Sequence, residues 1–308
     1  MDISPLSEVR ILENKNVLSA LSGGIFLSEI NLAGTHDSAT AFCAFSRLAK
    51  CQSHTFKEQL EMGVRLLDIR LCRTGNRFYL VHGKANCYRD ASKKERLSFD
   101  EVFAVLQAFL RENPRETVVL SIKRDRGYLQ KPFFKAFYNQ YIRPQKNLWY
   151  LENRVPRLSE CCGKLVLLRR CKKSADFEEK AFCGLDFSVW EDQASRTETS
   201  TLMVTLSADC RAHVQDRYRL APERKWNDCE KPFLESAQTS PHEICLHYLS
   251  TCGGNGVPEE NAVYVNAQFL DYPLPKDRAC GWFFLDFPTE ALCDKIMRSN
   301  LELWGNQA

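Results

Sequence analysis

Short runs of Val, Ile, Leu and Phe recur along the chain, and most of them are apolar on both faces. Strands that are buried in a parallel sheet have this pattern, whereas half-exposed strands alternate apolar with polar residues. The pattern predicts strands over residues 30–33, 65–71, 77–81, 117–123, 165–170, 202–207, 244–249 and 281–287.

Segments with apolar residues at helical spacing lie between most of these runs. The clearest is 98–112, where Ser98 and Glu101 form a capping box before one apolar stripe and Asn113-Pro114 ends the helix. Further helices are predicted over 55–62, 131–141, 224–237 and 289–304.

Strands that alternate with helices indicate an α/β fold, here an irregular, distorted TIM-type (β/α) barrel. The irregularity comes from residues 74–76, a tight TGN turn that joins the second and third predicted strands and leaves no room for a crossover helix. We expect residues 1–308 to form a single domain of this kind.

Composition narrows the function classes. The chain has 308 residues, 44% apolar and 26% charged, so it can bury a sizeable core. The net charge of +3 is too small to favour nucleic acid as a partner. No run approaches the roughly 18 apolar residues of a membrane span. The N-terminus shows no signal-peptide pattern, which leaves two localisations open: cytoplasmic, or secreted with the signal already removed.

The chain contains 14 cysteines without a C-x-x-C pair or a Cys/His cluster at zinc spacing. Several lie in apolar stretches, which favours buried free thiols in a reducing environment. The even number leaves disulfides open.

Ionisable side chains fall near the ends of six predicted strands, and barrel enzymes carry their catalytic groups at the carboxyl ends of strands. A single histidine there would more commonly be structural, but six contributions to one rim indicate a site. They are His36 and Asp37, Arg65 with Asp68 and Arg70, His82, Lys123, Arg170 and Asp286.

These residue types suggest a chemistry. Two histidines can serve as general base and general acid, and a carboxylate such as Asp286 can orient one of them. The cations Arg70, Lys123 and Arg170 suit a phosphate or a polyol. The carboxylates are too few for a Mg²⁺ or Ca²⁺ site, so the pattern predicts phosphoryl transfer without metal.

Seven motifs then appear in order: GTHDSAT (34–40), EQLEMGVRLLDIRL (58–71), LVHG (80–83), ETVVLSIKRD (116–125), GKLVLLRR (163–170), VQDRY (214–218) and GWFFLDFP (281–288). In this order and spacing they resemble the bacterial type of phosphatidylinositol-specific phospholipase C, the X-domain family. The resemblance covers most of the chain and implies an irregular TIM barrel. It also implies cleavage of phosphatidylinositol to diacylglycerol and inositol 1,2-cyclic phosphate.

The resemblance implies roles by position. His36 resembles the base for the inositol 2-hydroxyl and His82 the acid for the diacylglycerol oxygen. Arg70 resembles the arginine that stands where mammalian relatives hold Ca²⁺. The remaining positions resemble supporting and substrate-binding residues: Asp37 beside the acid, Asp286 behind the base, Asp68 near Arg70, and Lys123, Arg170, Asp216 and Tyr218 at the inositol, with Trp190 a weaker match.

The resemblance also implies that no metal and no other cofactor is needed. Position 37 is Asp where calcium-dependent relatives would have Asn, and Arg70 would repel a cation.

A lipid substrate requires contact with a membrane surface. Residues 39–52 place Phe42, Phe45 and Leu48 at helical spacing beside basic residues, which predicts a small amphipathic helix with Phe42 and Phe45 as contact residues. A helix packed against the barrel is the alternative. We expect a monomer that binds membranes peripherally.

Two other functions remain. One is a catalytically silent inositol-lipid-binding module on the same barrel, which the presence of both histidines disfavours. The other is a barrel phosphodiesterase that uses a carboxylate-bound metal, for which the chain lacks ligands.

Overall fold

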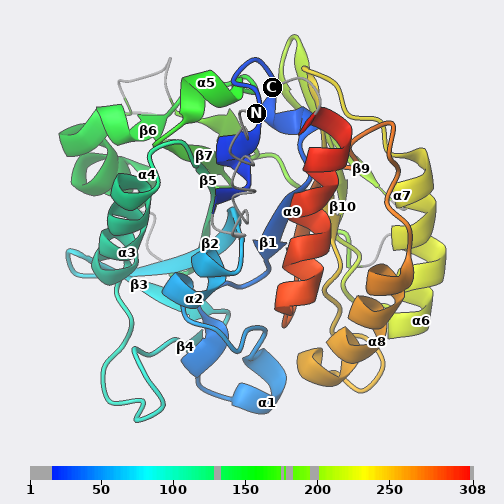
Figure 1. Ribbon diagram of the computed structural model, residues 1–308. Coiled ribbons are helices and arrows are strands. Elements are labelled where there is room, and N and C mark those ends of the chain that lie inside the picture. Colours follow the sequence, from blue (N-terminus) through cyan, green and yellow to red (C-terminus); the bar gives the residue numbers. More distant parts are fainter. Residues whose placement is uncertain (1–15, 128–132, 175–176, 178–182, 195–200, 306–308) are drawn as a thin grey trace, which may run out of the picture.

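The computed structural model describes residues 16–127, 133–174, 177, 183–194 and 201–305 (Figure 1). One curved sheet organises these residues, in the strand order β6-β7-β5-β2-β1-β12-β11-β10-β9. The strands are β1 (Leu32–Thr35), β2 (Leu66–Thr74), β5 (Val118–Arg126), β6 (Trp149–Tyr150), β7 (Leu165–Arg169), β9 (Leu202–Ser207), β10 (Cys210–Gln215), β11 (Glu243–Tyr248) and β12 (Trp282–Leu285).

Neighbours from β6 to β10 pair in parallel, and β9 pairs antiparallel with β10. β8 (Leu185–Asp186) extends the outer side of β7. Within the described ranges no ladder joins β9 to β6 or β8, so the barrel is open there. The predicted irregular barrel is confirmed.

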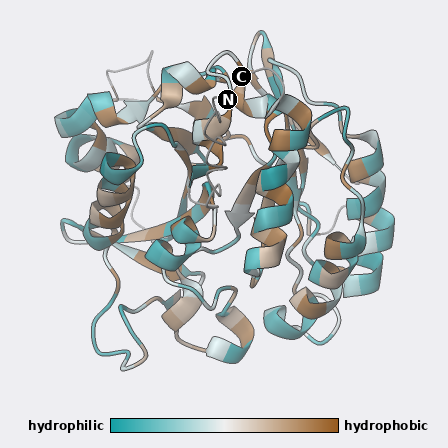
Figure 2. Cartoon of the chain, viewed as in Figure 1, coloured by the Kyte–Doolittle hydropathy of each residue, from teal (hydrophilic) through white to brown (hydrophobic). Residues whose placement is uncertain are grey.

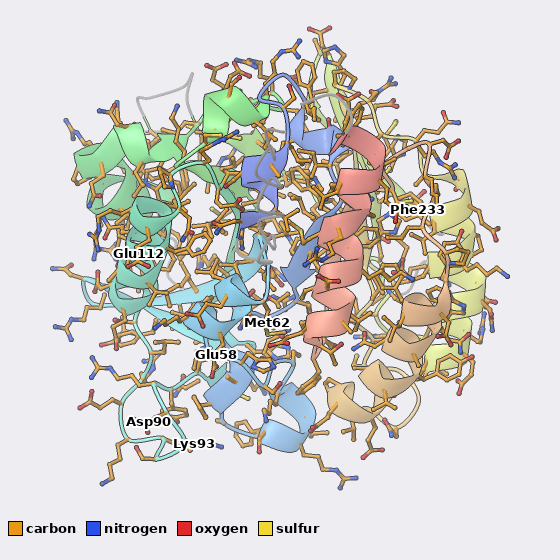
Figure 3. All side chains as sticks on the ribbon, viewed as in Figure 1. Glu58, Met62, Asp90, Lys93, Glu112 and Phe233 are labelled. Carbon is orange, nitrogen blue, oxygen red and sulfur yellow. The ribbon has the colours of Figure 1, made fainter. Side chains whose placement is uncertain are left out.

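Parallel pairing explains why the strands are apolar on both faces. All four residues of β1 and of β12 are buried, because side chains fill the barrel on one side and helices cover the other. Figure 2 shows mostly brown central strands and outer helices that alternate brown with teal. Among the side chains in Figure 3, Phe233 of α7 (Lys231–Ser236) points inward and stacks on His247.

Three of the predicted helices begin at capped N-termini, and the capping box predicted for Ser98 and Glu101 is confirmed. Thr55 and Glu58 cap α2 (Phe56–Glu61), Ser98 and Glu101 cap α3 (Phe99–Glu112), and Thr289 caps α9 (Glu290–Trp304). The helix expected over 224–237 is continuous from α6 (Pro222–Arg224) through the π-helical η7 (Lys225–Glu230) to α7.

For the helix expected over 131–141, α4 (Phe133–Phe137) continues into the π-helical η5 (Tyr138–Ile142), and residues 131–132 lie outside the described part. No helix of the described part is both long and apolar enough to span a bilayer.

The TGN turn is confirmed as a hairpin. Thr74 pairs with Arg77, and Gly75 takes a positive φ of 61° that suits glycine. β3 (Arg77–His82) therefore folds back antiparallel on β2 and pairs with β4 (Ala85–Asn86), outside the barrel path. Its prediction as a barrel strand was wrong. Several elements were also missed, of which the longest are the barrel strand β10 and the helix α8 (Pro258–Asp271).

Residues 39–52, here called the foot, do not form the single amphipathic helix predicted. A 3₁₀ turn, η4 (Thr40–Phe42), is separated from the short helix α1 (Ser46–Ala49) by Phe45, whose φ of 52° breaks the helical path. Phe45 and Leu48 are 71% and 63% exposed. Phe42 is only partly exposed, because it turns into a groove beside α3.

Candidate active site

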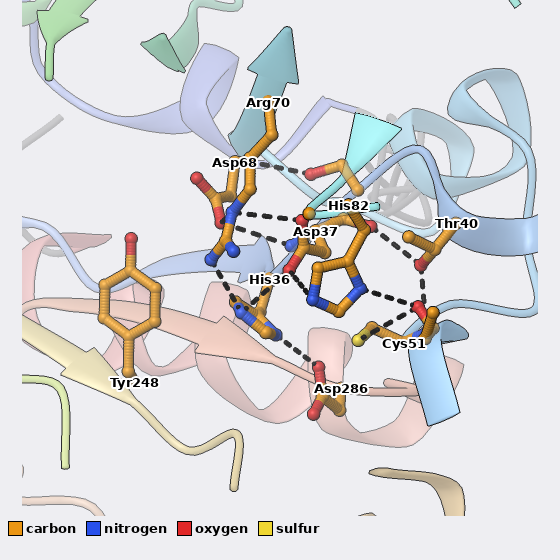
Figure 4. A network of polar contacts seen from close by, with 12 residues as sticks. His36, Asp37, Thr40, Cys51, Asp68, Arg70, His82, Tyr248 and Asp286 are labelled. Atoms are coloured by element: carbon orange, nitrogen blue, oxygen red, sulfur yellow. Dashed lines mark hydrogen bonds and ion pairs between the residues drawn. The ribbon is translucent and has the colours of Figure 1, made fainter. Parts of the chain in front are cut away.

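The rings of His36 and His82 lie edge to face at the carboxyl rim of the barrel, with centroids 6.2 Å apart and planes at 79° (Figure 4). His36 follows β1, and its backbone N–H donates to the Leu285 carbonyl at the end of β12. Its own carbonyl accepts from the Gln52 amide at 2.6 Å. His82 ends β3. The two rings thus approach each other from a barrel strand and from the hairpin that folds back beside it.

Two contacts determine which ring nitrogen of His36 carries the proton. Its Nδ1 lies 2.8 Å from Asp286 Oδ1, and its Nε2 lies 2.9 Å from Arg70 Nη2. A guanidinium can only donate, so Nε2 offers its lone pair and Nδ1 carries the proton that Asp286 accepts. Burial, then the charge of Arg70, lowers the pKa of His36 well below its ordinary value of 6.5. Burial likewise raises the pKa of Asp286. The site therefore holds a neutral imidazole.

Arg70 lies between two buried carboxylates. Its Nε is 3.0 Å from Asp37 Oδ1 and 3.0 Å from Asp68 Oδ2. Burial would raise the pKa of Asp68, but Arg70 and Arg170 together hold it below the ordinary value. For Asp37 burial prevails over Arg70 and His82, and raises its pKa to about 6. Asp68 thus stays an anion, whereas Asp37 can change its charge near neutral pH.

His82 bridges the foot and Asp37. Its Nδ1 lies 2.8 Å from the Ala49 carbonyl, and its Nε2 lies 3.3 Å from Asp37 Oδ2. A carbonyl only accepts, so Nδ1 carries a proton and Nε2 faces the carboxylate. Asp37 Oδ2 is also 3.1 Å from His36 Nε2, which places this carboxylate between the two rings.

A cavity of about 540 Å³ opens above these groups. Eight of the ten predicted catalytic and substrate-binding residues line it, and Asp37 and Asp68 lie beneath, in contact with Arg70. The eight are His36, Arg70, His82, Lys123, Arg170, Asp216, Tyr218 and Asp286. Arg65 behaves differently: it lies outside β2, at its base, and pairs with Glu116 at 2.7 Å rather than with Asp68.

One part of the cavity wall is built around Arg170. Arg170 stacks on the Trp190 ring at 3.8 Å and donates to the Tyr248 hydroxyl at 3.0 Å. Its Nη2 lies 3.9 Å from Asp216 Oδ2. Trp190, the weak sequence match, therefore does line the cavity.

Two residues of this region were missed: Tyr248, which is fully buried in contact with Arg170, and Asp192, which lines the cavity. Tyr248 ends β11, so the rule that selected the other strand ends could have found it. Asp192 accepts from the Tyr218 hydroxyl at 3.0 Å, but it lies in a loop without a recognisable pattern.

Three groups in the described part could in principle supply three metal ligands each: His36 with Cys51 and Asp286, Asp37 with Cys51 and His82, and His36 with Asp37 and Asp68. In the last group, Arg70 already stands between the two carboxylates. Burial raises the pKa of the Cys51 thiol in the other two well above its usual value, which disfavours the thiolate that a metal requires.

The protein-family model for "Phosphatidylinositol-specific phospholipase C, X domain" matches residues 35–171 of this chain. The 1-phosphatidylinositol phosphodiesterase of Staphylococcus aureus strain Newman is 28% identical, covering 89% of this chain and 88% of the relative. The 1-phosphatidylinositol phosphodiesterase of Listeria monocytogenes is 23% identical, covering 93% of this chain and 85% of the relative.

Solved structures are similar in fold. A phosphatidylinositol-specific phospholipase C of S. aureus is 24% identical with a TM-score of 0.77, over 93% of this chain and 97% of that one. The L. monocytogenes enzyme is 20% identical with a TM-score of 0.68, over 94% and 99%.

Fold and site together define a (β/α)-barrel protein with two histidines beside a partly buried arginine. More particularly, residues 35–171 match the X domain of phosphatidylinositol-specific phospholipase C, and the chain is similar over most of its length to bacterial 1-phosphatidylinositol phosphodiesterases.

Proposed function

We propose that this protein is a phosphatidylinositol-specific phospholipase C that releases diacylglycerol and inositol 1,2-cyclic phosphate without a metal ion. The observation that carries the proposal is the pair of opposed rings, His36 with Asp286 behind it and His82 with Asp37 beside it, on either side of Arg70. Cyclisation needs a base and an acid on opposite sides of the phosphorus, and this arrangement supports that geometry.

His36 acts as the base. Its neutral ring carries an unprotonated Nε2, which accepts from Arg70 in the structure and takes the proton of the inositol 2-hydroxyl when substrate occupies the cavity. The oxygen then attacks the phosphorus to which the lipid is attached. Asp286 accepts from Nδ1 and stabilises the imidazolium that forms.

His82 acts as the acid on the other side. Its Nδ1 is held by the Ala49 carbonyl, so Nε2 delivers a proton to the diacylglycerol oxygen as the phosphorus–oxygen bond breaks. Asp37 Oδ2 lies 3.3 Å from Nε2 and can accept a hydrogen bond from the N–H that this transfer uses.

Arg70 stabilises the negative charge that develops on the phosphoryl oxygens. Its guanidinium is positioned beforehand by Asp37 and Asp68, so the cation needs no reorganisation during the reaction. A cation fixed at this place supplies the charge that a metal ion would otherwise supply.

The inositol ring occupies the cavity above Arg70. Lys123, Arg170, Asp216 and Tyr218 offer donors and acceptors for its hydroxyls, and Asp68 supports Arg70 and Arg170 from below. Cations and carboxylates side by side suit the hydroxyls of a neutral polyol better than they suit a ligand that carries several anionic groups.

The foot provides the peripheral membrane contact of a monomeric enzyme. Phe45 and Leu48 expose their side chains beside the cavity mouth, and Arg47 is exposed between them. Apolar side chains next to a basic residue suit the surface of an anionic bilayer. Phe42 is turned away from it, so the contact rests on Phe45 and Leu48.

The test is ³¹P NMR of phosphatidylinositol vesicles incubated with the protein in EDTA. Appearance of the cyclic phosphodiester signal is expected. No product in any buffer would favour the catalytically silent module, and product that disappears only in EDTA would favour a metal-dependent mechanism.

A further inference from the structure

Cys43 and Cys87 are direct partners in a short antiparallel bridge between the foot and the segment after β4. Two backbone hydrogen bonds flank the pair, from Ala44 N to Asn86 O at 2.9 Å and from Tyr88 N to Phe42 O at 2.7 Å. Neither cysteine contributes its own backbone groups to these bonds. The pair therefore occupies a non-hydrogen-bonded position, where opposed Cα atoms are about 4.5 Å apart and side chains project from the same face.

A disulfide requires Cα atoms roughly 4.4 to 6.8 Å apart and Cβ atoms that face each other. The ladder position satisfies both conditions. It is also the single ladder position in the described part of the chain where two cysteines are opposed. Both thiols are free in the structure, and both side chains are fully buried.

We propose that Cys43 and Cys87 form a disulfide when the chain folds in an oxidising environment. Each thiol loses its proton, one Sγ–Sγ bond forms, and the two electrons reduce a low-molecular-weight disulfide, such as oxidised glutathione, to two thiols. The bond needs no rearrangement of the fold, because the backbone ladder already holds the two residues opposite each other.

The bond forms during folding rather than in the finished protein. Burial raises the pKa of Cys43 to about 11 and raises that of Cys87 well above its usual value. Little thiolate exists in the closed fold, and oxidants cannot reach either sulfur, so the reduced folded protein oxidises slowly. The presence of the disulfide therefore depends on the redox environment during folding and not on the environment of the folded protein.

The disulfide fixes the foot to the hairpin that carries His82. Ala85 of β4 pairs with His82, and the His82 ring binds the Ala49 carbonyl of the foot. Figure 1 shows β4 beside the foot, which includes α1. The covalent link adds a second attachment to the 2.8 Å hydrogen bond between His82 Nδ1 and Ala49. Formation of this disulfide does not depend on the catalytic activity proposed above.

Peptide mapping of the refolded full chain tests the proposal. The reduced, denatured protein is refolded either in excess oxidised glutathione or in reduced glutathione, free thiols are blocked with iodoacetamide, and the digest is analysed by mass spectrometry. A peptide linked through Cys43 and Cys87 is expected after oxidative refolding. Cys43 linked to the nearby Cys51, or both cysteines carrying glutathione or the blocking group, would overturn the proposal.

Thermal unfolding of the same samples provides a second measurement. The oxidised protein should melt several degrees above the reduced one, and Cys43→Ser or Cys87→Ser should abolish this difference. Cys293→Ser, at a buried cysteine on α9 without a cysteine opposite, should retain it. A shift that persists in Cys43→Ser would contradict the assignment. If a variant does not refold, the wild-type peptide map decides alone.

Discussion

The Asp286 carboxylate lies 2.8 Å from His36 Nδ1, while Arg70 occupies the other side of the same ring at 2.9 Å from Nε2. β12 and β1 are parallel neighbours, so the residues that follow them meet at the rim. The pair fixes one tautomer of a partly buried histidine, with the proton on Nδ1 and the lone pair of Nε2 directed at Arg70.

Replacing Asp286 with Asn should therefore impair catalysis more than binding. The amide can donate to Nδ1 and stabilise the wrong tautomer, and we expect kcat to fall about 10²- to 10⁴-fold with a small change in KM. Hydrolysis of soluble inositol 1,2-cyclic phosphate measures both constants. Asp271→Asn, at the far end of α8, is the matched control. Activity of Asp286→Asn within a few-fold of wild type would contradict the orienting role.

Arg70→Lys tests whether geometry matters beyond charge. A lysine keeps the cation but cannot contact Asp37, Asp68 and His36 at once, so kcat/KM should fall about 10²- to 10³-fold. Arg73→Lys, further along β2 and outside the cavity, should have no effect. Added Ca²⁺ should restore nothing, and a Ca²⁺-dependent recovery would argue for a metal site.

The pH dependence of kcat/KM follows from the lowered pKa of His36. The base works only when unprotonated, and burial with Arg70 keeps it so below the ordinary value of 6.5. Activity should thus persist below pH 6.5 and be lost only as the pH falls through the lowered value. Asp37, with a pKa of about 6, loses its charge as the pH falls through that value and should add to the loss on the acid side. An acid limb centred above pH 6.5 would contradict this electrostatic account.

Phe45→Ser should separate membrane binding from chemistry. Removing a 71% exposed aromatic side chain should weaken binding to phosphatidylinositol vesicles roughly tenfold, measured by sedimentation, because the ring no longer enters the bilayer. Hydrolysis of the soluble cyclic phosphate should be unchanged. Leu270→Ser, an exposed apolar residue near the end of α8, should alter neither. Equal loss of both activities in Phe45→Ser would indicate a structural role.

The rim of the site was predictable because parallel strands align their carboxyl ends. Apolar runs located β1, β2, β5, β7 and β12, and the ionisable residues near their ends meet around one cavity. His82 reached the same rim by another route, since the hairpin returns β3 alongside β2.

Other features depend on tertiary contacts that leave a weak local signal. β10 has the sequence CRAHVQ, in which polar residues interrupt the apolar pattern of a buried strand. It forms a strand because it pairs with β9 and β11. α8 has a blurred apolar stripe, because Asn261 is buried on its inner face while Val263 and Leu270 are exposed on the outer one. The break in the foot needs a left-handed conformation at Phe45, which a phenylalanine does not favour by itself.

The most direct test of the two-histidine mechanism compares His36→Ala and His82→Ala on two substrates, phosphatidylinositol and an inositol phosphodiester with a nitrophenol leaving group. Nitrophenolate departs without a proton, so His82→Ala should be inactive on the lipid but retain much of the wild-type rate on the nitrophenyl ester. His36→Ala should be inactive on both, because each reaction needs the 2-hydroxyl deprotonated. Equal loss in His82→Ala on both substrates would contradict its assignment as the acid.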